Sequence, residues 1–372
     1  MKIALIVPGG VDPSGTHRVI PAILALIERL ASRHELHVYA LRQVPEPAEW
    51  ELFGARIHNI GLRHMRSRAL RAILREHRRA RFDLIQSIFS ERCGVIAVAA
   101  AKLAHIPCAV HVAGGEITAI PSIAYGGRLA WKGRVREALV LRLANAVTSA
   151  SAPMISALEG LGIHATRVPL GIDLKAWPWR PPSMRPLDGP ARLLHVASLN
   201  RVKDQPTLLR AFARVAERWP LASLDIVGED VLQQRIHRQA AALGLGERVR
   251  FHGFLTQSEL RPLMEAAHVL VMSSLHEAGP IVALEAAVAG VPTVGTHVGH
   301  IAEWAPAAAL SAPPGDDAGL AAHIGTLLGD EARRLAMAAA AQARAVREDA
   351  DHTAQCFERL HEDLVARDRR ER

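Results

Sequence analysis

The sequence predicts an α/β protein with two doubly wound domains, and three observations support this. Short apolar runs alternate with longer amphipathic segments over the first 170 residues, a proline-rich stretch interrupts the pattern, and the alternation then resumes. Strands that alternate with helices are typical of βαβ units in a parallel sheet. A chain of 372 residues is also long enough for two domains of ordinary size.

Each half of the pattern supplies five strands and the helices between them. In the first half, strands are expected at 3–7, 35–40, 83–87, 108–112 and 146–149. Helices are expected there at 17–32, 66–80, 91–104, 126–144 and 151–160. In the second half, strands are expected at 192–197, 223–227, 249–251, 269–272 and 293–295. Helices are expected at 205–219, 231–243, 257–266 and 281–289, and again from about residue 316 onward.

A proline-rich segment at 175–190, which holds five prolines, divides the two halves. Proline removes a ladder hydrogen bond and breaks helix interiors, so this segment is expected to be a hinge. We therefore expect an N-terminal Rossmann-like domain over 1–170, a hinge over 171–190, a C-terminal domain over 191–345 and a helical tail over 346–372. The sequence allows this tail to pack back on the N-terminal domain.

Composition excludes several classes of protein. The chain is 49% hydrophobic and 22% charged, which is typical of a globular protein. Its three cysteines share no short spacing, so we expect no disulfide framework and no structural zinc site. No cluster of metal ligands is visible in the sequence either, and neither a metal nor a cofactor is expected. The apolar run at 93–101 is too short to span a bilayer, and the run at 3–7 is too short for a signal peptide. A cytoplasmic location is expected, with peripheral attachment to the inner face of a membrane left open.

Positive charge is concentrated in the first half of the chain. Residues 1–170 hold 22 Lys and Arg against 12 Asp and Glu. Eight arginines form a cluster, called here the Arg block: Arg63, Arg66, Arg68, Arg71, Arg75, Arg78, Arg79 and Arg81. Such a cluster suits an acidic partner, such as an anionic membrane surface or a phosphorylated substrate, or it is simply a solvated helix face. Nucleic acid is not expected, because the cluster lacks aromatic residues for base stacking.

The loop after the first strand, residues 9–17, contains glycines but fits no nucleotide motif. The Gly-x-Gly-x-x-Gly spacing is absent, and Thr16 stands where a P-loop requires lysine. The loop is nevertheless expected to end at a helix start, where Ser14 or Thr16 caps the helix and free amides bind an anion. Ser14 and Gly15 are therefore candidate substrate-binding residues.

The most informative stretch is 274–292, which follows a buried strand. Pro280 is suited to the first position of a helix, and Gly290 ends that helix before Pro292. Glu277 then lies just ahead of a helix N-terminus, and Glu285 lies inside the helix. A helix N-terminus at the end of a parallel strand favours binding of a diphosphate. The two carboxylates would then lie on either side of that diphosphate. This arrangement suits a nucleotide-sugar, in which a hydroxyl-rich ring lies on each side of the diphosphate. The alternative is that neither residue binds a ligand, with Glu277 a solvated loop residue and Glu285 a residue on the helix surface.

Glu277 and Glu285 with seven residues between them resemble the Glu-x7-Glu signature of the retaining glycosyltransferases of family four, which have the GT-B fold. Other segments resemble motifs of that family: Val-Gly-Glu at 227–229, Val-Arg-Phe-His-Gly-Phe-Leu at 249–255, Gly-Val-Pro-Thr-Val-Gly-Thr-His-Val-Gly at 290–299, Val-Pro-Leu-Gly-Ile-Asp at 168–173, Ser-Leu-Asn-Arg-Val-Lys at 198–203 and Ser-Gly at 14–15. The resemblance implies two Rossmann-like domains that face a central cleft.

The resemblance also implies roles for individual residues. Glu277 would face the donor sugar, Glu285 the ribose and Lys203 the diphosphate. Ser198 stands where the family has an arginine, so Arg201 is the candidate replacement. Further donor contacts are expected at Gly279, Ile281 and Val282, and the base is expected near Gly253 and Phe254.

Two residues near the end of the strand at 108–112 are also candidates. The family often has a histidine where this chain has His111, so a catalytic role is expected for it, against the alternative of a structural histidine. Glu116 is a candidate for substrate binding, against the alternative of a capping residue.

These observations together predict a retaining glycosyltransferase that moves a sugar from a nucleoside-diphosphate sugar to an acceptor hydroxyl. The expected acceptor is a glycan or a lipid-linked molecule, in polysaccharide, glycolipid or cell-envelope glycan assembly. Two alternatives stay open: a GT-B sugar-nucleotide epimerase, and a non-catalytic nucleotide-sugar-binding scaffold. Side chains do not encode the nucleobase, because backbone groups are expected to contact it.

Overall fold

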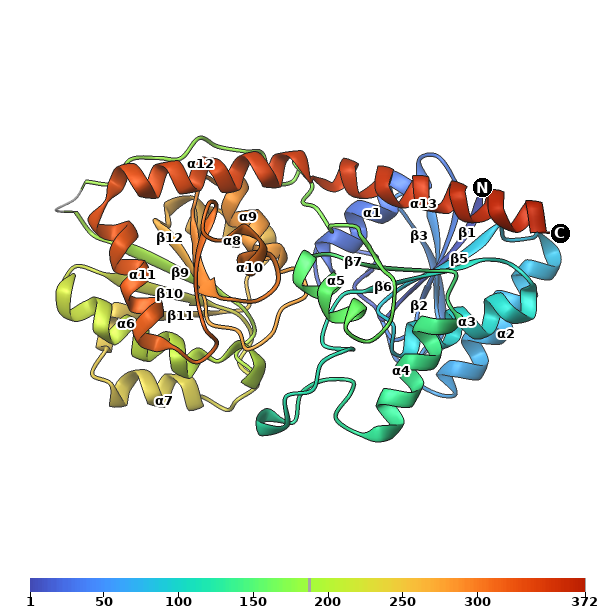
Figure 1. Ribbon diagram of the computed structural model, residues 1–372, viewed down its shortest axis with the longest axis horizontal. Helices are drawn as coiled ribbons and strands as arrows, with labels where there is room; N and C mark the ends of the chain where they lie inside the picture. The colour runs from blue at the N-terminus through green and yellow to red at the C-terminus, as the bar shows by residue number, and fades with distance from the viewer. Residues whose placement is uncertain (187–188, 372) are drawn as a thin grey trace. The chain divides into compact units, whose positions relative to one another are not determined.

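The computed structural model describes residues 1–186 and 189–371, which form two compact α/β units (Figure 1). Unit 1 comprises Met1–Asp173 together with Glu348–Arg372, and unit 2 comprises Leu174–Arg347. Residues 187–188 of the expected hinge and residue 372 of the expected tail lie outside the described residues. The predicted class, two doubly wound α/β domains, is confirmed by the two sheets described below.

Unit 1 contains an eight-stranded sheet with the order β3-β4-β2-β1-β5-β6-β7-β8. Its strands are β1 (Lys2–Val7), β2 (Glu35–Ala40), β3 (Ala48–Leu52), β4 (Ala55–Asn59), β5 (Leu84–Ile88), β6 (Cys108–Val112), β7 (Ala146–Ser149) and β8 (Thr166–Arg167). All neighbours pair in parallel except β3, which is antiparallel to β4. The β3–β4 hairpin was not predicted, because its strands mix charged and apolar residues at the sheet edge.

The helices of unit 1 cover both faces of this sheet. They are α1 (Pro21–Ala31), α2 (Met65–Arg79), the 3₁₀ turn η1 (Pro121–Ile123), α3 (Arg92–Ala104), α4 (Trp131–Leu143), α5 (Ala152–Glu159) and α13 (Ala350–Glu371). α2, α3 and α4 pack side by side, and α13 packs against α1 (Figure 1). Phe357 of α13 is fully buried in the core that β1, β2 and α1 build.

Two helices of unit 1 begin later than predicted. α1 begins at Pro21 with Ile20 as its N-cap, so neither Ser14 nor Thr16 caps it, and that expectation was wrong. α4 begins at Trp131 rather than at residue 126. Gly126 has a φ of +113°, and a Cβ there would lie 2.1 Å from the carbonyl oxygen of Thr118. A positive φ is not helical, so the chain at Gly126 lies outside the helix, and the close approach to Thr118 requires a glycine there.

Unit 2 contains a six-stranded, fully parallel sheet with the order β11-β10-β9-β12-β13-β14. Its strands are β9 (Arg192–Val196), β10 (Ser223–Val227), β11 (Val249–Gly253), β12 (Val269–Met272), β13 (Thr293–Thr296) and β14 (Ala309–Ala312). Its helices and 3₁₀ turns are η2 (Arg201–Lys203), α6 (Gln205–Arg218), α7 (Arg235–Ala242), η3 (Gly246–Arg248), α8 (Gln257–Ala266), α9 (Ile281–Val288), α10 (Gly299–Trp304), α11 (Asp317–Gly329) and α12 (Glu331–Arg347). Apolar residues of these strands, of α6 and of α11 form one core.

The proline-rich segment belongs to unit 2 from Leu174 onward. Trp177 is 3% exposed, and the backbone N–H of Arg180 donates to the carbonyl of Val288 at 2.9 Å. The backbone N–H of Arg185 donates to Oε1 of Glu331 at 2.7 Å. The described part of this segment is therefore anchored to α9 and α12, and a bending motion within 171–190 stays a prediction.

Candidate functional site

The strand order of unit 2 reverses at β9, which is the first strand of the unit in the chain and lies at the centre of its sheet. β10 and β11 extend the sheet on one side of β9, and β12 to β14 extend it on the other. In such sheets, ligands bind outside the carboxyl ends of the strands at the reversal point. The loops that follow β9 and β12 therefore define the candidate site of this unit.

Glu277 and Lys203 meet across this reversal point. Nζ of Lys203 lies 2.5 Å from Oε1 of Glu277, and the hydroxyl of Ser274 donates to the same oxygen at 2.6 Å. The lysine side chain is 23% exposed and the glutamate side chain 11%. An ion pair at this depth excludes most water yet stays within reach of a ligand, so a phosphate could replace one of its partners.

Backbone contacts fix the two loops that carry this pair. Oδ1 of Asn200 accepts from the backbone N–H groups of Val202 and Lys203, at 3.1 and 3.2 Å. The hydroxyl of Ser273 donates to the carbonyl of Lys203 at 2.8 Å, and the N–H of Leu275 donates to the carbonyl of Val202 at 2.8 Å. The sequence forms a capped turn here, and that turn is tied directly to the loop of Glu277.

Gly299, the first residue of α10, supports Glu277 from behind. Its φ is +50°, and a Cβ there would lie 3.1 Å from Cβ and from the carbonyl oxygen of Glu277. Glycine is required at this position both for the backbone conformation and for the close approach. Gly299, the last residue of the 290–299 motif, therefore leaves the space that the backbone and Cβ of Glu277 occupy.

Glu285 lies in the second turn of α9 and is 7% exposed. Burial raises the pKa of its carboxyl to about 7, although Nε2 of Gln257 donates to Oε1 at 3.3 Å and lowers it. A buried carboxyl with a single weak partner is costly to keep in a folded protein. Such a group is a candidate for ligand binding.

The remaining candidates of unit 2 lie at the same carboxyl edge of the sheet. Gly279 is half-buried just ahead of α9, and Ile281 and Val282 form its first turn; Pro280 is its N-cap. Arg201 is exposed in η2, two residues from Lys203. Gly253 is the last residue of β11, and Phe254 follows it.

Phe254 exposes 63% of its surface, which is unusual for a phenylalanine. Gly253 has a φ of +67°, and its carbonyl accepts the N–H of Gly228 at 2.8 Å, which joins the ends of β10 and β11. An exposed ring at a strand end gives a planar base a face on which to stack.

Unit 1 has its own reversal point, at β1, with β2 on one side and β5 on the other. A cavity of about 520 Å³ lies there, at the carboxyl ends of these strands and of β6. Its lining includes Pro8, Arg42, Phe89, Arg92, Glu116 and Tyr125. Sequence reasoning found Glu116 but missed Arg42, which comes shortly after the strand expected at 35–40, and Arg92, which lies at the start of the helix expected at 91–104.

Glu116 holds two loops of this cavity together. Its Oε1 accepts the backbone N–H groups of Ser90 and Ala113, both at 3.2 Å, and its Oε2 accepts that of Gly114 at 2.5 Å. Burial raises the pKa of this carboxyl, and the three amides oppose the rise. The geometry fits the capping alternative, and substrate binding by Glu116 stays a prediction.

Glu137 of α4 is a buried carboxyl that sequence reasoning missed. The hydroxyl of Ser90 donates to its Oε1 at 2.5 Å, so Ser90 bridges Glu116 and Glu137 through its N–H and its hydroxyl. Burial raises the pKa of Glu137 to about 7. In the sequence it is one more glutamate on a helix, and only the packing of α4 shows that it faces inward.

His111 lies in the core of unit 1, and it does not line the cavity. It is fully buried, its Nδ1 lies 2.9 Å from Oγ1 of Thr148, and its ring packs edge-on against Phe357 of α13 at 5.6 Å. Burial lowers the pKa of its imidazole to about 3, so the ring is neutral at physiological pH. This position supports the structural alternative and gives no support to the expected catalytic role.

Ser14 and Gly15 lie in the loop between β1 and α1, and neither lines the cavity. Oγ of Ser14 accepts the backbone N–H groups of Thr16 and His17 at 3.4 and 3.2 Å. Gly15 has a φ of +67°. The serine hydroxyl therefore closes a turn in the exposed loop, and an anion contact there stays a prediction.

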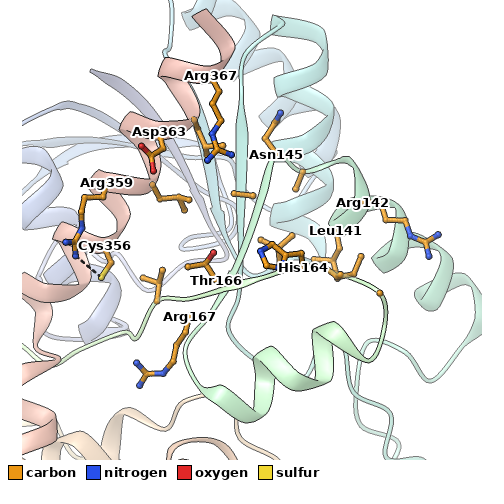
Figure 2. Close-up of a pocket in the computed structure, with 18 residues that line it drawn as sticks. Leu141, Arg142, Asn145, His164, Thr166, Arg167, Cys356, Arg359, Asp363 and Arg367 are labelled. Atoms are coloured by element: carbon orange, nitrogen blue, oxygen red, sulfur yellow. Dashed lines mark hydrogen bonds between the residues drawn. The ribbon is translucent and has the colours of Figure 1, made fainter. Parts of the chain in front are cut away.

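A second hollow of unit 1, of about 730 Å³, lies near the starts of β7 and β8 and beside α13 (Figure 2). Its lining includes Arg142, Arg167, Arg359, Arg367 and Asp363. Nη2 of Arg359 donates to Sγ of Cys356 at 3.6 Å. This hollow lies at the end of the strands opposite to the reversal point, where doubly wound sheets do not usually bind ligands.

Within residues 1–186 and 189–371, one group of side chains has the geometry for a metal ion: Glu35, His37 and Glu76. Nζ of Lys2 already lies 3.0 Å from Oε1 of Glu35 and 2.6 Å from Oε1 of Glu76. The lysine ammonium therefore supplies the positive charge that a metal would bring. In the same described residues, no helix is long and apolar enough to cross a membrane.

Two doubly wound units, each with polar groups at its reversal point, define a two-domain α/β protein of the kind that binds ligands at strand ends. The model of the Glycosyl transferase 4-like domain matches residues 19–171, and the model of Glycosyl transferases group 1 matches residues 182–344. The two matches fall in units 1 and 2 respectively. The chain belongs to the group 1 glycosyltransferase family, which confirms the resemblance found in the sequence.

Curated relatives and solved structures agree with this assignment. Glycogen synthase of Mycobacterium tuberculosis H37Rv is 34% identical over 214 residues, which are 56% of this chain and 51% of that protein. The 2-deoxystreptamine N-acetyl-D-glucosaminyltransferase of Streptomyces fradiae is 36% identical over 140 residues, which are 36% and 33% of the two chains. The matched part of the chain thus spans about half the length of the first relative and about a third of the length of the second.

Sucrose-phosphate synthase from Thermosynechococcus elongatus has a TM-score of 0.82 at 20% identity, with 98% of this chain and 100% of that chain covered. HepE of Anabaena, solved in complex with UDP-glucose, has a TM-score of 0.75 at 20% identity, with the same coverage of the two chains. Similarity at this level of identity shows the fold, and it confirms the expected GT-B architecture.

Proposed function

We propose that this protein is a retaining glycosyltransferase that transfers a sugar from a nucleoside-diphosphate sugar to an acceptor hydroxyl. The observation that carries the proposal is the 2.5 Å contact between Lys203 and Glu277, which spans the reversal point just ahead of α9. A donor of this class has a diphosphate that needs cations and amides, and a sugar that needs hydrogen-bond acceptors. The site offers both groups side by side.

The chemistry assigns each group a task. The bond between the anomeric carbon and the phosphate oxygen breaks, and its electron pair goes to the leaving nucleoside diphosphate. Lys203 and the amides at Gly279, Ile281 and Val282 stabilise the charge that grows on this leaving group. The acceptor oxygen attacks on the same face, and its proton passes to the departing phosphate oxygen. Glu277 accepts hydrogen bonds from the sugar hydroxyls.

Glu285 is assigned to the ribose. Its pKa of about 7 means that the carboxyl is partly ionised at neutral pH in the absence of ligand. Two ribose hydroxyls that donate to it would favour the ionised form and offset the cost of its burial. Phe254 offers a stacking face to the base, and Arg201 is the proposed second cation for the diphosphate.

The acceptor is proposed to bind the 520 Å³ cavity of unit 1, beside Glu116. A glycan or a lipid-linked acceptor fits the proposal, in polysaccharide, glycolipid or envelope glycan assembly on the cytoplasmic side of a membrane. The Arg block supports attraction to an anionic membrane surface. Arg71, Arg75, Arg78 and Arg79 are exposed on α2, whereas Ile73 of the same helix is buried.

Titration of the full chain with nucleotide-sugars, followed by product analysis, tests the proposal. UDP-glucose is the first donor to try, because Anabaena HepE was solved with it, and GDP- and ADP-glucose serve as comparisons. We expect binding of one donor and release of its nucleoside diphosphate with an acceptor present. Glu277→Gln should abolish most of this release, whereas the matched variant Glu247→Gln, at an exposed site in η3, should retain it.

The alternatives give different results in the same experiment. An epimerase would change the sugar of the donor in the absence of an acceptor, which proton NMR of the recovered nucleotide-sugar would detect. A scaffold would bind the donor but release no nucleoside diphosphate under any condition. Either result would replace the proposed transferase.

A further inference from the structure

The outward face of α4 is apolar although it faces solvent. Trp131, Val135, Leu139 and Leu143 follow each other at intervals of four residues and are 64%, 49%, 55% and 45% exposed. Side chains at this spacing lie on one face of a helix. Large side chains exposed together in a row indicate an interaction surface, whereas single exposed ones are common.

Positive charges surround this row. Lys132, Arg134 and Arg142 are exposed on α4, Arg136 of the same helix is half-buried, and Arg128 is half-buried just ahead of it. Between residues 117 and 143 the sequence has one carboxylate, Glu137, and it is fully buried against Ser90. The exposed face of α4 therefore combines apolar side chains with cations, of which Arg136 has a carboxylate nearby, Glu91 at 3.9 Å. A tryptophan with flanking Lys and Arg is typical of helices that lie in a membrane interface.

The face of α4 differs from that of α2, the helix that carries most of the Arg block. α2 exposes arginines, whereas its apolar residues, such as Ala69 and Ile73, are buried. Arginines alone attract an anionic surface from a distance, and this attraction weakens with salt. Of these two helices, α4 is the one that presents a row of large exposed apolar side chains, which can enter the apolar part of a bilayer.

α4 is also tied to the cavity of unit 1. Tyr125, Gly126 and Gly127 line the cavity and lead directly into the helix. Ser90, bonded to Glu137 of α4, precedes Glu91 and Arg92, which line the cavity too. A surface that binds α4 is therefore held close to the cavity by short, buried connections.

We propose that α4 docks this protein on an anionic bilayer, with Trp131, Val135, Leu139 and Leu143 inserted at the level of the headgroups and its cations on lipid phosphates. The docked helix holds the cavity at the membrane surface, where a lipid-linked acceptor is present. This second point rests on the function proposed above, whereas the docking itself does not.

Charge favours a lipid surface over a second copy of the chain. A two-fold dimer through α4 would bring the cations of both copies together, and Glu91 beside Arg136 would offset one positive charge in each copy. Four side chains on one helix also form a small patch compared with the roughly 800 Å² per partner that stable dimers bury. An anionic bilayer, by contrast, complements both the charge and the apolar row.

Co-sedimentation of the full chain with vesicles tests the docking. Vesicles of phosphatidylcholine with phosphatidylglycerol are compared with pure phosphatidylcholine, at low and at physiological salt. We expect binding to the anionic vesicles that persists at physiological salt, and a loss of at least tenfold in the double variant Val135→Gln/Leu139→Gln. Leu103→Gln, at a 60% exposed site on α3, is the matched control and should bind as the unmodified protein does.

Other outcomes would overturn the proposal. Binding that survives Val135→Gln/Leu139→Gln but is lost in Arg71→Gln/Arg75→Gln/Arg78→Gln/Arg79→Gln would assign the contact to α2. A mass of two copies in light scattering that returns to one copy in the α4 variant would assign this face to self-association. No binding to anionic vesicles at low salt would also exclude docking.

Tryptophan fluorescence supplies an independent measurement. On binding, Trp131 should shift its emission to the blue and be quenched by brominated lipid, and Trp131→Phe should remove both effects although five tryptophans remain. Donor binding to the α4 variants should be unchanged, because their substitutions lie in unit 1. Vesicle binding without transferase activity would support the docking and reject only the proposed function.

Discussion

The reversal points of the two sheets hold their carboxylates in different ways. In unit 2, Glu277 is held by the lysine ammonium of Lys203 and the hydroxyl of Ser274. In unit 1, Glu116 is held by three backbone N–H groups. A lysine can move to a phosphate when a ligand arrives, whereas a backbone amide cannot leave its loop. The same topology thus gives one site whose ion pair can be exchanged and one whose shape is fixed.

A second contrast concerns buried carboxyls. Burial raises the pKa of Glu285 in unit 2 and of Glu137 in unit 1 to about 7. Glu137 has a short hydrogen bond from Ser90, whereas Glu285 has only a 3.3 Å contact with Gln257. Unit 1 therefore uses one oxygen of its buried carboxyl to hold Ser90, whereas the weaker contact of Glu285 in unit 2 is one that hydroxyls of a ligand can replace.

The largest expected effect is on stability, in Glu285→Gln. The folded protein keeps the Glu285 proton up to about pH 7, whereas the unfolded chain releases it near pH 4.5. The free energy of unfolding therefore falls as the pH rises through this window. The total decrease is ~3 kcal/mol once Glu285 is ionised in the folded state as well as in the unfolded state. At pH 8, chemical denaturation should show Glu285→Gln to be more stable than the unmodified protein, and titration should show weaker donor binding. If the unmodified protein and Glu285→Gln each had the same free energy of unfolding at pH 5 and at pH 8, the raised pKa of Glu285 would be contradicted.

The next largest effect is a loss of stability in Glu116→Gln, in contrast to the gain expected for Glu285→Gln. The amide group of glutamine turns a donor toward backbone N–H groups that need an acceptor, which costs about 2 kcal/mol. Denaturation of the full chain measures the loss, and donor binding should not change. A fully stable Glu116→Gln with impaired transfer would instead make Glu116 a substrate-binding residue and remove the contrast between the two units.

Glu277→Gln should retain the fold and the binding of the nucleoside diphosphate, and should lower transfer at least tenfold, or ~1.4 kcal/mol in activation free energy. The reason is that a charge next to the reacting sugar is lost while the side chain keeps its size. Initial rates at saturating donor measure the effect. A turnover close to that of the unmodified protein would remove Glu277 from the mechanism.

The smallest effects concern the cations. Lys203→Ala should weaken binding of the nucleoside diphosphate by about 1 kcal/mol, because the lysine is partly exposed and is screened by water. Arg201→Ala should weaken it less, because Arg201 is exposed in η2. Calorimetric titration of both variants gives the comparison. An unchanged dissociation constant in Arg201→Ala would show that Arg201 does not replace the arginine missing at Ser198.

The sequence predicted the features that depend on local patterns, such as strands and short motifs. The strands β1, β6 and β12 consist mostly of apolar residues, and they lie where they were expected. Lys203 and Glu277 were selected from motifs 74 residues apart, and the structure brings them into contact. Parallel sheets explain this success, because the carboxyl ends of adjacent strands meet at one edge whatever the distance along the chain.

Features that depend on distant packing could not be predicted. His111 has the position of a site residue at a strand end, but Phe357 of α13 covers it, and no local pattern indicates that contact. Glu137 looks like a surface residue until α4 is placed on Ser90. The exposed row on α4 was missed for the same reason, because an apolar helix residue is normally expected in the core.

The C-terminal helix α13 has a consequence for how the chain is made. Unit 1 is not continuous in the sequence: unit 2 is inserted into it between Asp173 and Glu348. Phe357 and Val365 of α13 complete a core whose sheet is synthesised long before them, and the imidazole of His361 contacts the side chain of Gln86. On the ribosome, unit 2 can finish folding first, while the earlier sheet and α1 wait for the part of their core that α13 supplies. The half of the chain that is synthesised first is thus the last to complete its apolar core.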